Sequence, residues 1–273
     1  MNIFEVLFIV PIVNLLVFFY NIFTKIGLPG AMGWSIVGVT SAVRLAINPF
    51  MKHQMEQSQK MQRLQPQIAK LQKKYKTEPV KLQQAQMEIY KNEKINPGYG
   101  CLIFIIQIPI FIGLYNALTK LVTNGTATKA IEAINSMVYT SAMKITHLDM
   151  HFLGLDLTRK PSEWQTLGWW YALIPIVTAL SQMYQAYLTT KMNPVAKKKI
   201  EPVKDKKNVQ KAEEPDMQAM MQKQMMYIFP LMIGWVSFNF PVGLALYWNI
   251  FTLFGIWQYS QKPKISPEIE KKK

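Results

Sequence analysis

A polar stripe interrupts an apolar segment near the start of the chain, and it consists of Thr40, Ser41, Arg44 and Asn48. Their spacing places all four on one face of a helix. Inserting an arginine at the middle of a membrane-spanning helix costs about 2.5–3.5 kcal/mol on translocon scales, so such a residue faces the interior of a bundle or a water-filled cavity. Because a guanidinium binds carboxylates strongly, the stripe predicts a site for acidic or strongly polar groups.

Arg44 has no acidic partner in the five predicted core spans: no Asp or Glu occurs in 31–51, 98–119, 167–189 or 225–260. An arginine without a carboxylate needs water, hydroxyls or carbonyls around it. We therefore expect a hydrated cavity that is open to one side of the membrane. The alternative is an arginine that snorkels to the nearer interface and serves only as an anchor.

Other apolar segments also carry polar side chains that could line the same cavity. They are Gln107, Asn116, Ser181, Gln182, Gln185, Tyr247 and Asn249. For each of them taken alone, hydrogen bonding between neighbouring helices is the simpler explanation.

Sequence signatures of catalysis are absent: there is no nucleophile elbow, no His-Glu-x-x-His pair and no phosphate-binding loop. His147, Asp149 and His151 resemble a metal cluster, but a structural zinc site requires four ligands. Cys101 is the only cysteine, which excludes an internal disulfide. We predict a protein that is not an enzyme and that uses no cofactor or metal.

Apolar blocks near 20 residues long alternate with charged connections, and this length suits a bilayer core of about 30 Å. The blocks predict an all-α membrane protein with a five-transmembrane-helix core, its spans being 31–51, 98–119, 167–189 and the two helices of 225–260, joined at Phe240 and Pro241. Residues 1–30 form a further apolar helix, which either lies in the membrane interface or is a sixth span.

The connections between these blocks carry most of the basic charge. Residues 52–97, 190–224 and 261–273 hold 10, 9 and 5 of the 31 Lys and Arg residues, and the net charge is +15. The positive-inside rule therefore predicts that these three segments, and the C-terminus, are cytoplasmic, with the loop 120–166 outside. Apolar residues at helical spacing on both sides of Pro79 predict that 52–97 forms a helical hairpin.

Several motifs, taken in order, resemble the YidC/Oxa/Alb membrane protein insertase family. They are TSAVR at 40–44, NPF at 48–50, SQKMQRLQP at 58–66, EKINPGYGCL at 93–102, IQIPIF at 106–111, FLGLDL at 152–157 and FNFPVGLALYW at 238–248. The combination is specific although no single motif is, and it covers nearly the whole chain. The sequence shows no large extracytoplasmic domain, so it resembles a short bacterial member of the family.

The resemblance implies a helical core around a hydrophilic groove that is open to the cytoplasm and to lipid and closed on the outside. Arg44 matches a groove arginine that receives the polar part of an incoming protein, with the matching threonine, Thr40, one turn before it. Tyr247 and Trp248 match an aromatic pair late in the last span. The expected substrate-groove residues are Thr40, Ser41, Arg44, Asn48, Gln107, Gln182, Gln185, Tyr247 and Trp248.

The function that the resemblance implies is insertion and chaperoning of nascent membrane proteins at the bacterial plasma membrane. Further partners it implies are the ribosome, bound by the basic loops and tail, and the Sec translocon. Anionic lipids are an additional partner for the lysine-rich segments. The alternative is a small-solute transporter or channel in which Arg44 binds an anion.

Overall fold

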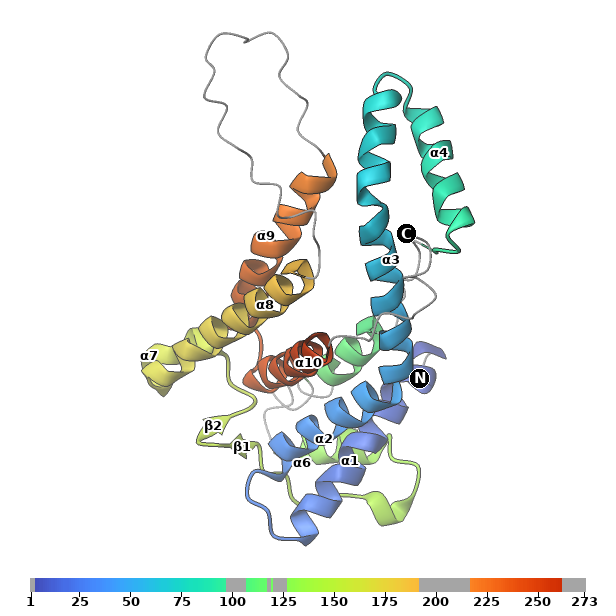
Figure 1. Ribbon diagram of the computed structural model, residues 1–273. Coiled ribbons are helices and arrows are strands. Elements are labelled where there is room, and N and C mark those ends of the chain that lie inside the picture. The colour runs from blue at the N-terminus through green and yellow to red at the C-terminus, as the bar shows by residue number, and fades with distance from the viewer. Residues whose placement is uncertain (1–2, 97–106, 117–118, 120–126, 192–216, 262–273) are drawn as a thin grey trace.

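The computed structural model describes residues 3–96, 107–116, 119, 127–191 and 217–261. These residues are predominantly helical, with one short β-hairpin, so the helical class predicted from the sequence is confirmed at this level (Figure 1). The five-helix membrane core stays a prediction.

Four helices form the central body: α2 (Ala31–Ala46), α8 (Leu173–Lys191), α9 (Met217–Asn239) and α10 (Val242–Ser260). Helix α8 packs against α9, and α10 packs against both α2 and α8, as Figure 1 shows. Leu244 and Ala245 of α10 are fully buried at this centre. The helical segment 107–116 contributes Phe111, whose ring lies 5.3 Å from that of Trp248.

The join between α9 and α10 consists of Phe240 and Pro241, as the sequence predicts. Proline disfavours helical geometry in the residue before it, so α9 ends there and the chain turns back. Helix α9 begins at Met217, which makes the last part of the predicted loop 190–224 helical. Its first residues are rich in Met, Gln and Ala, all of which favour helix.

Two other predicted boundaries differ from the structure. Helix α2 ends at Ala46, and α3 (Asn48–Lys74) begins with Asn48 because Pro49 suits the first turn of a helix. The predicted span 167–189 starts later, at Leu173. Gly168 adopts φ 113°, a value that glycine tolerates. It separates two short helices that come before α8, namely α7 (Trp164–Leu167) and η4 (Trp169–Ala172).

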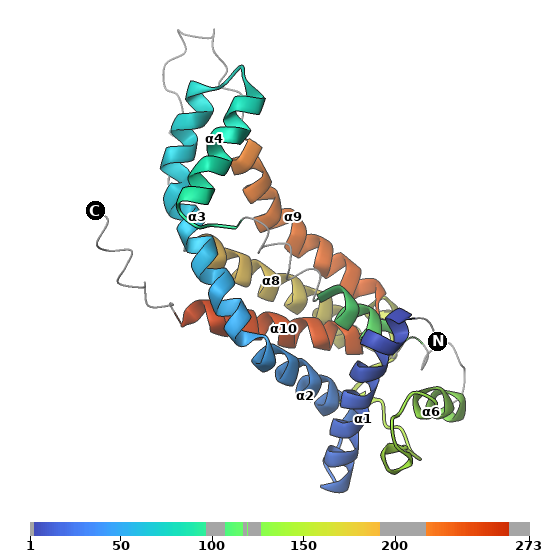
Figure 2. The ribbon, with the colours of Figure 1, turned by 90° about the vertical axis from the view of Figure 1, so that its right-hand side faces the viewer.

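Helix α3 extends beyond the central body, and α4 (Pro79–Asn92) folds back along it (Figure 2). Leu64, Ile68 and Ile95 are buried between the two helices and form a small core of their own. The sequence predicts these two helices within 52–97, and the structure has both of them. Their cytoplasmic location stays a prediction.

The N-terminal helix comprises a π-helical turn, η1 (Glu5–Ile9), followed by α1 (Val10–Lys25). Within the part of the chain that the structure describes, it is the one helix that meets both the length and the apolarity needed to cross a bilayer. Residues Ala31–Ala46 and Met226–Asn239 form apolar helices that are shorter. Helix α1 packs along α2 and buries Val13, Leu16 and Val17. Both placements of residues 1–30 stay predictions.

The segment from 127 to 163 contains α6 (Ala127–Asn135), η2 (Ser141–Met143), β1 (His151–Phe152), β2 (Leu155–Asp156) and η3 (Pro161–Glu163). The two strands pair antiparallel. Leu153 and Gly154 between them have φ of 51° and 79°, the positive values that a tight two-residue hairpin turn requires. This hairpin carries Phe152 to the start of α2.

Candidate functional site

Arg44 is 2% exposed and lies between α2 and α10. Its Nη2 donates to the carbonyl oxygen of Phe251 at 2.6 Å, and its Nη1 donates to Oε1 of Gln258 at 3.4 Å. The guanidinium carbon lies 3.4 Å from the centroid of the Phe251 ring, which is a cation–π geometry. Its Nε has no hydrogen-bond partner among the described residues.

Neutral groups of α10 thus stand where the sequence offers no carboxylate. The carbonyl acceptor that we expected for Arg44 is present at Phe251. The burial argues against the snorkelling alternative, in which the charged end of the side chain is solvated. An open hydrated cavity around Arg44 stays a prediction, because Phe251 and Gln258 cover the guanidinium in this structure.

Gln258 links Arg44 to the start of the next helix. The side chain of Gln258 is 6% exposed, and its Nε2 donates to Oδ1 of Asn48 at 3.0 Å. Sequence analysis did not single out Gln258. A signal existed, because Phe251 and Gln258 follow Tyr247 by 4 and 11 residues and therefore share its helical face.

The two hydroxyl residues of the polar stripe differ from Arg44 in their contacts. Thr40 is buried, and its Oγ1 donates to the carbonyl oxygen of Ile36 at 2.6 Å, one turn earlier in α2. Ser41 is half-buried. The hydroxyl of Thr40 therefore satisfies the backbone of its own helix in this structure.

Tyr247 lies on the same face of α10 as Phe251, with ring centroids 6.1 Å apart, and Nε2 of Gln107 donates to its hydroxyl. Gln107 therefore joins the surroundings of Arg44 through Tyr247. Trp248 faces the helical segment 107–116 instead, against Phe111. The predicted aromatic pair thus makes contacts of two different kinds.

A second polar cluster joins α8 to α10. Ser181 Oγ donates to Oδ1 of Asn249 at 3.0 Å, and Nδ2 of Asn249 donates to Oγ1 of Thr178 at 2.8 Å. Gln185, on the same helix, packs so closely on Gly255 that a side chain there would collide with it. Gln182 and Asn116 are half-buried. Of the predicted groove residues, Gln185 belongs to this α8–α10 contact rather than to the contacts of Arg44.

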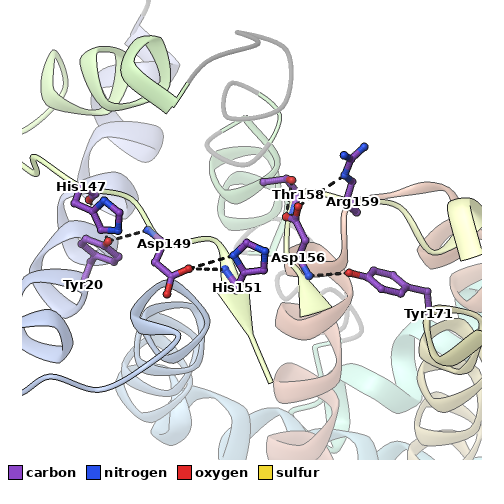
Figure 3. Close-up of polar contacts among 8 residues, drawn as sticks. All are labelled: Tyr20, His147, Asp149, His151, Asp156, Thr158, Arg159 and Tyr171. Carbon is purple, nitrogen blue, oxygen red and sulfur yellow. Dashed lines mark hydrogen bonds and ion pairs between the residues drawn. The ribbon is translucent and has the colours of Figure 1, made fainter. Parts of the chain in front are cut away.

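Residues 150–160, here called the strap, connect the ends of three helices (Figure 3). Phe152 fills the space beside Gly30 and Gly33 at the start of α2. The carbonyls of Leu157 and Arg159 accept from the backbone N–H groups of Gly243 and Val242, each at 2.9 Å. These bonds satisfy the free N–H groups in the first turn of α10.

The strap also reaches the start of α8 through Tyr171, whose hydroxyl accepts from the backbone N–H of Asp156 at 2.8 Å. The strap therefore holds α2, α8 and α10 together at the ends where all three helices begin. The hairpin of α3 and α4 leaves the body where α2 ends, which is the opposite end.

The histidines of the same region take part in hydrogen bonds through their backbone atoms, and the ring Nδ1 of His151 lies 3.4 Å from Oδ1 of Asp149. His147 gives its carbonyl to the hydroxyl of Tyr20 at 3.0 Å, and Asp149 Oδ1 accepts from the backbone N–H of His151 at 2.9 Å (Figure 3). Within the described ranges, the structure contains no group of three His, Cys, Asp or Glu residues that could hold a metal ion. Cys101 lies outside the described residues.

Comparisons with known proteins agree on one family. Its model, described as 60Kd inner membrane protein, matches residues 22–266. The relatives include a "Membrane protein insertase YidC" of Polynucleobacter asymbioticus, 32% identical over 85% of this chain and 32% of its own length. Another protein of that name, from Streptomyces avermitilis, is 30% identical over 89% of this chain and 55% of its own length.

A third relative, from Chlamydomonas reinhardtii, is named "Inner membrane ALBINO3-like protein 2, chloroplastic". It is 30% identical over 85% of this chain and 49% of its own length. The chain thus spans between about a third and about half of the length of these three relatives.

Proposed function

Because the chain belongs to the 60Kd inner membrane protein family, we propose that it is a membrane protein insertase that receives the polar flank of a nascent chain at Arg44. The observation that carries the proposal is the state of Arg44, a buried cation whose side chain donates to the neutral Phe251 carbonyl and Gln258 amide. The names of its relatives support the same function.

The chemistry of these contacts favours exchange with a substrate. A charge-assisted pair between arginine and a carboxylate is roughly twice as strong as a bond between neutral groups. An acidic flank that reaches Arg44 therefore competes well against the Phe251 carbonyl and the Gln258 amide. The Nε of Arg44 is buried without a hydrogen-bond partner in the described part of the chain, so it is a further donor that such a flank would satisfy once Phe251 and Gln258 give way.

The energetics of insertion need no nucleotide in this mechanism. A polar flank crossing hydrocarbon loses its hydration, and a hydrated groove lowers that penalty by raising the local dielectric. The apolar segment of the substrate then leaves sideways into lipid, which is favourable because apolar surface leaves water. Arg44 accordingly acts on the polar part of the substrate, and lipid accepts the rest.

The topology we propose is multi-pass in a bacterial plasma membrane, with the hairpin 52–97 and the C-terminus in the cytoplasm. Exposed aromatic residues at both ends of α8 support it: Trp169 and Trp170 precede the helix, and Tyr184 and Tyr187 lie near its end. Trp170 and Tyr187 are 17 residues apart, or about 25 Å along a helix, and aromatic belts mark the two membrane interfaces at a similar separation.

The partners we propose besides nascent membrane proteins are the ribosome, the Sec translocon and anionic lipids. The support is the basic charge of 190–224 and 261–273. Ribosome binding should weaken as salt rises, and removing 261–273 should reduce both the affinity and this salt dependence. A cosedimentation assay over a salt series measures both quantities.

The central experiment replaces Arg44 with alanine and follows insertion of a single-span substrate with an acidic outer flank. We expect insertion of this substrate to fall at least about tenfold, because the charge-assisted contact is lost. A substrate with a neutral flank should lose much less. Arg63→Ala, which removes an exposed arginine of α3, is the matched control. Equal insertion of the acidic substrate by Arg44→Ala and the unmodified protein would contradict the proposal.

If the protein is instead a small-solute transporter or channel, the alternative from the sequence, a different experimental result is expected. Liposomes holding the protein would show a solute flux that depends on Arg44. An insertase gives no such flux but crosslinks to a stalled nascent chain from positions beside Arg44. The two assays on one preparation separate the functions.

A further inference from the structure

Gln258 forms hydrogen bonds with both Arg44 and Asn48. Its Oε1 accepts from Arg44 Nη1 at 3.4 Å, while its Nε2 donates to Asn48 Oδ1 at 3.0 Å. The side chain is 94% buried, so water does not compete freely for either end. The amide of Gln258 thus accepts a hydrogen bond from the arginine and donates one to the start of α3.

Asn48 is the residue at which α3 begins, two residues after α2 ends. Helix α3 contains 27 residues and extends about 40 Å from this point, into the α3–α4 hairpin. A tilt of the first part of α3, before Pro66, pivots near this junction, where Ile47 separates the two helices. Asn48 is therefore placed to pass such a movement on to Gln258.

The chemistry requires an amide at position 258. Glutamate would keep an acceptor for Arg44 but could not donate to Asn48, and leucine would do neither. Phe251 contacts Arg44 independently through its carbonyl and ring, so Arg44 keeps part of its site when Gln258 is changed. Changes at Gln258 should alter the availability of Arg44 without removing Arg44 from α10 altogether.

We propose that Gln258 is a positioning residue that holds Arg44 closed against α10 and makes its release depend on Asn48 at the base of the hairpin. This role of Gln258 deepens the proposed function and depends on it, since Arg44 is the residue that is proposed to meet the substrate. The contact itself can be tested without any insertion assay.

The test uses the full chain in membranes and phenylglyoxal, which modifies arginine. The chain has three arginines, and Arg63 and Arg159 serve as internal references because both are exposed. Peptide mass spectrometry gives the rate at Arg44 relative to these two. The variants are Gln258→Leu, Gln258→Glu and Asn48→Ala. The matched control is Gln261→Leu, which changes an exposed glutamine three residues further along the chain.

The relative rate at Arg44 should rise at least about threefold in Gln258→Leu, which corresponds to the loss of one weak hydrogen bond, as the 3.4 Å distance between Arg44 and Gln258 indicates. Asn48→Ala should raise it by a smaller factor, since Gln258 keeps Arg44 but loses its own anchor. Gln258→Glu should lower it, because the carboxylate pairs with Arg44. Gln261→Leu should leave it unchanged.

Two results overturn the proposal: an unchanged rate at Arg44 in Gln258→Leu, or an equal rise in Gln261→Leu. A rise at Arg44 accompanied by an equal rise at Arg159 would show general loosening and counts against it as well. If Asn48→Ala has no effect while Gln258→Leu does, the dependence on the hairpin is wrong. The proposed function fails separately, when Arg44→Ala inserts the acidic substrate normally.

Discussion

At the scale of single residues, the arrangement around Arg44 shows how one cation is kept in an apolar body without a carboxylate. A backbone carbonyl, an amide and an aromatic face share the task, and they come from Phe251 and Gln258 of a single helix. Each neutral partner binds the guanidinium less strongly than an anion would. This is the arrangement that we propose an acidic group of the substrate displaces.

Phe251→Leu tests the aromatic part of this arrangement. The change keeps the backbone carbonyl and an apolar side chain but removes the ring over Arg44, so we expect a loss of about 1–2 kcal/mol. Unfolding in detergent, followed by circular dichroism, measures it. Phe254→Leu is the matched control on the same helix, because the ring of Phe254 pairs with Trp257 instead. Equal losses in the two variants would show that the guanidinium gains nothing from the ring.

At the scale of elements, the strap and the hairpin differ in how they contact the helices of the central body. The strap fixes the starts of α2, α8 and α10 through Phe152, two backbone hydrogen bonds to α10 and Tyr171. The hairpin has its own small core and leaves the body at one junction. The end of the bundle at the strap is thus tied together by the strap, while at the hairpin end the side chains of Arg44, Gln258 and Asn48 join α2, α10 and α3.

Gly33→Ala should weaken the strap. A Cβ at this position collides with the ring of Phe152, and overpacking of this kind costs about 1–3 kcal/mol. The same change made in a Phe152→Ala background should cost much less, because the ring is then absent. A double-mutant cycle by thermal unfolding measures the coupling between the two positions. Additive effects of the two changes would exclude the contact as the cause.

Ile68→Ala should loosen the hairpin without weakening the body. Ile68 is 1% exposed and belongs to the small core of α3 and α4. Truncation leaves a cavity there, which should lower the stability of the hairpin by about 2–5 kcal/mol. Limited proteolysis should then cut α4 sooner, while the main unfolding transition stays in place. Val80→Ala, at a side chain that is 67% exposed, is the control. A lowered main transition in Ile68→Ala would mean that the two cores unfold together.

At the scale of the whole molecule, the strap and the hairpin lie at opposite ends of a helical body, with Arg44 between them. This order suits a protein that is closed on one side of the membrane and accepts a chain from the other. The proposed orientation of the two ends with respect to the cytoplasm rests on the distribution of basic residues.

Single-cysteine labelling tests that orientation. In a Cys101→Ser background, Gln83→Cys on α4 and Thr146→Cys before the strap are both at exposed positions. A maleimide that cannot cross membranes should label position 146 in intact cells and position 83 only after the cells are broken. The reverse pattern would overturn the proposed topology, and labelling of both positions in intact cells would show leaky cells, which a cytoplasmic marker protein detects.

The amino-acid sequence by itself determined the helical class, the join at Phe240 and Pro241 and the two helices within 52–97, and it singled out Arg44 as a candidate site residue. These follow from local spacing, charge and the cost of an arginine among apolar residues, all of which can be read along the chain. The start of α8 at Leu173 was less accessible, because the backbone geometry at a single residue, Gly168, interrupts the helix before it.

Only the tertiary structure decided which groups surround Arg44. Phe251 and Gln258 are more than 200 positions away in the sequence, and a backbone carbonyl leaves no mark on residue type. Likewise, the polar residues of α8 could not be assigned to the Arg44 surroundings or to Asn249 from their types alone. Spacing fixes the face of a helix that a residue occupies, but the packing of α10 against both α2 and α8 decides what that face meets.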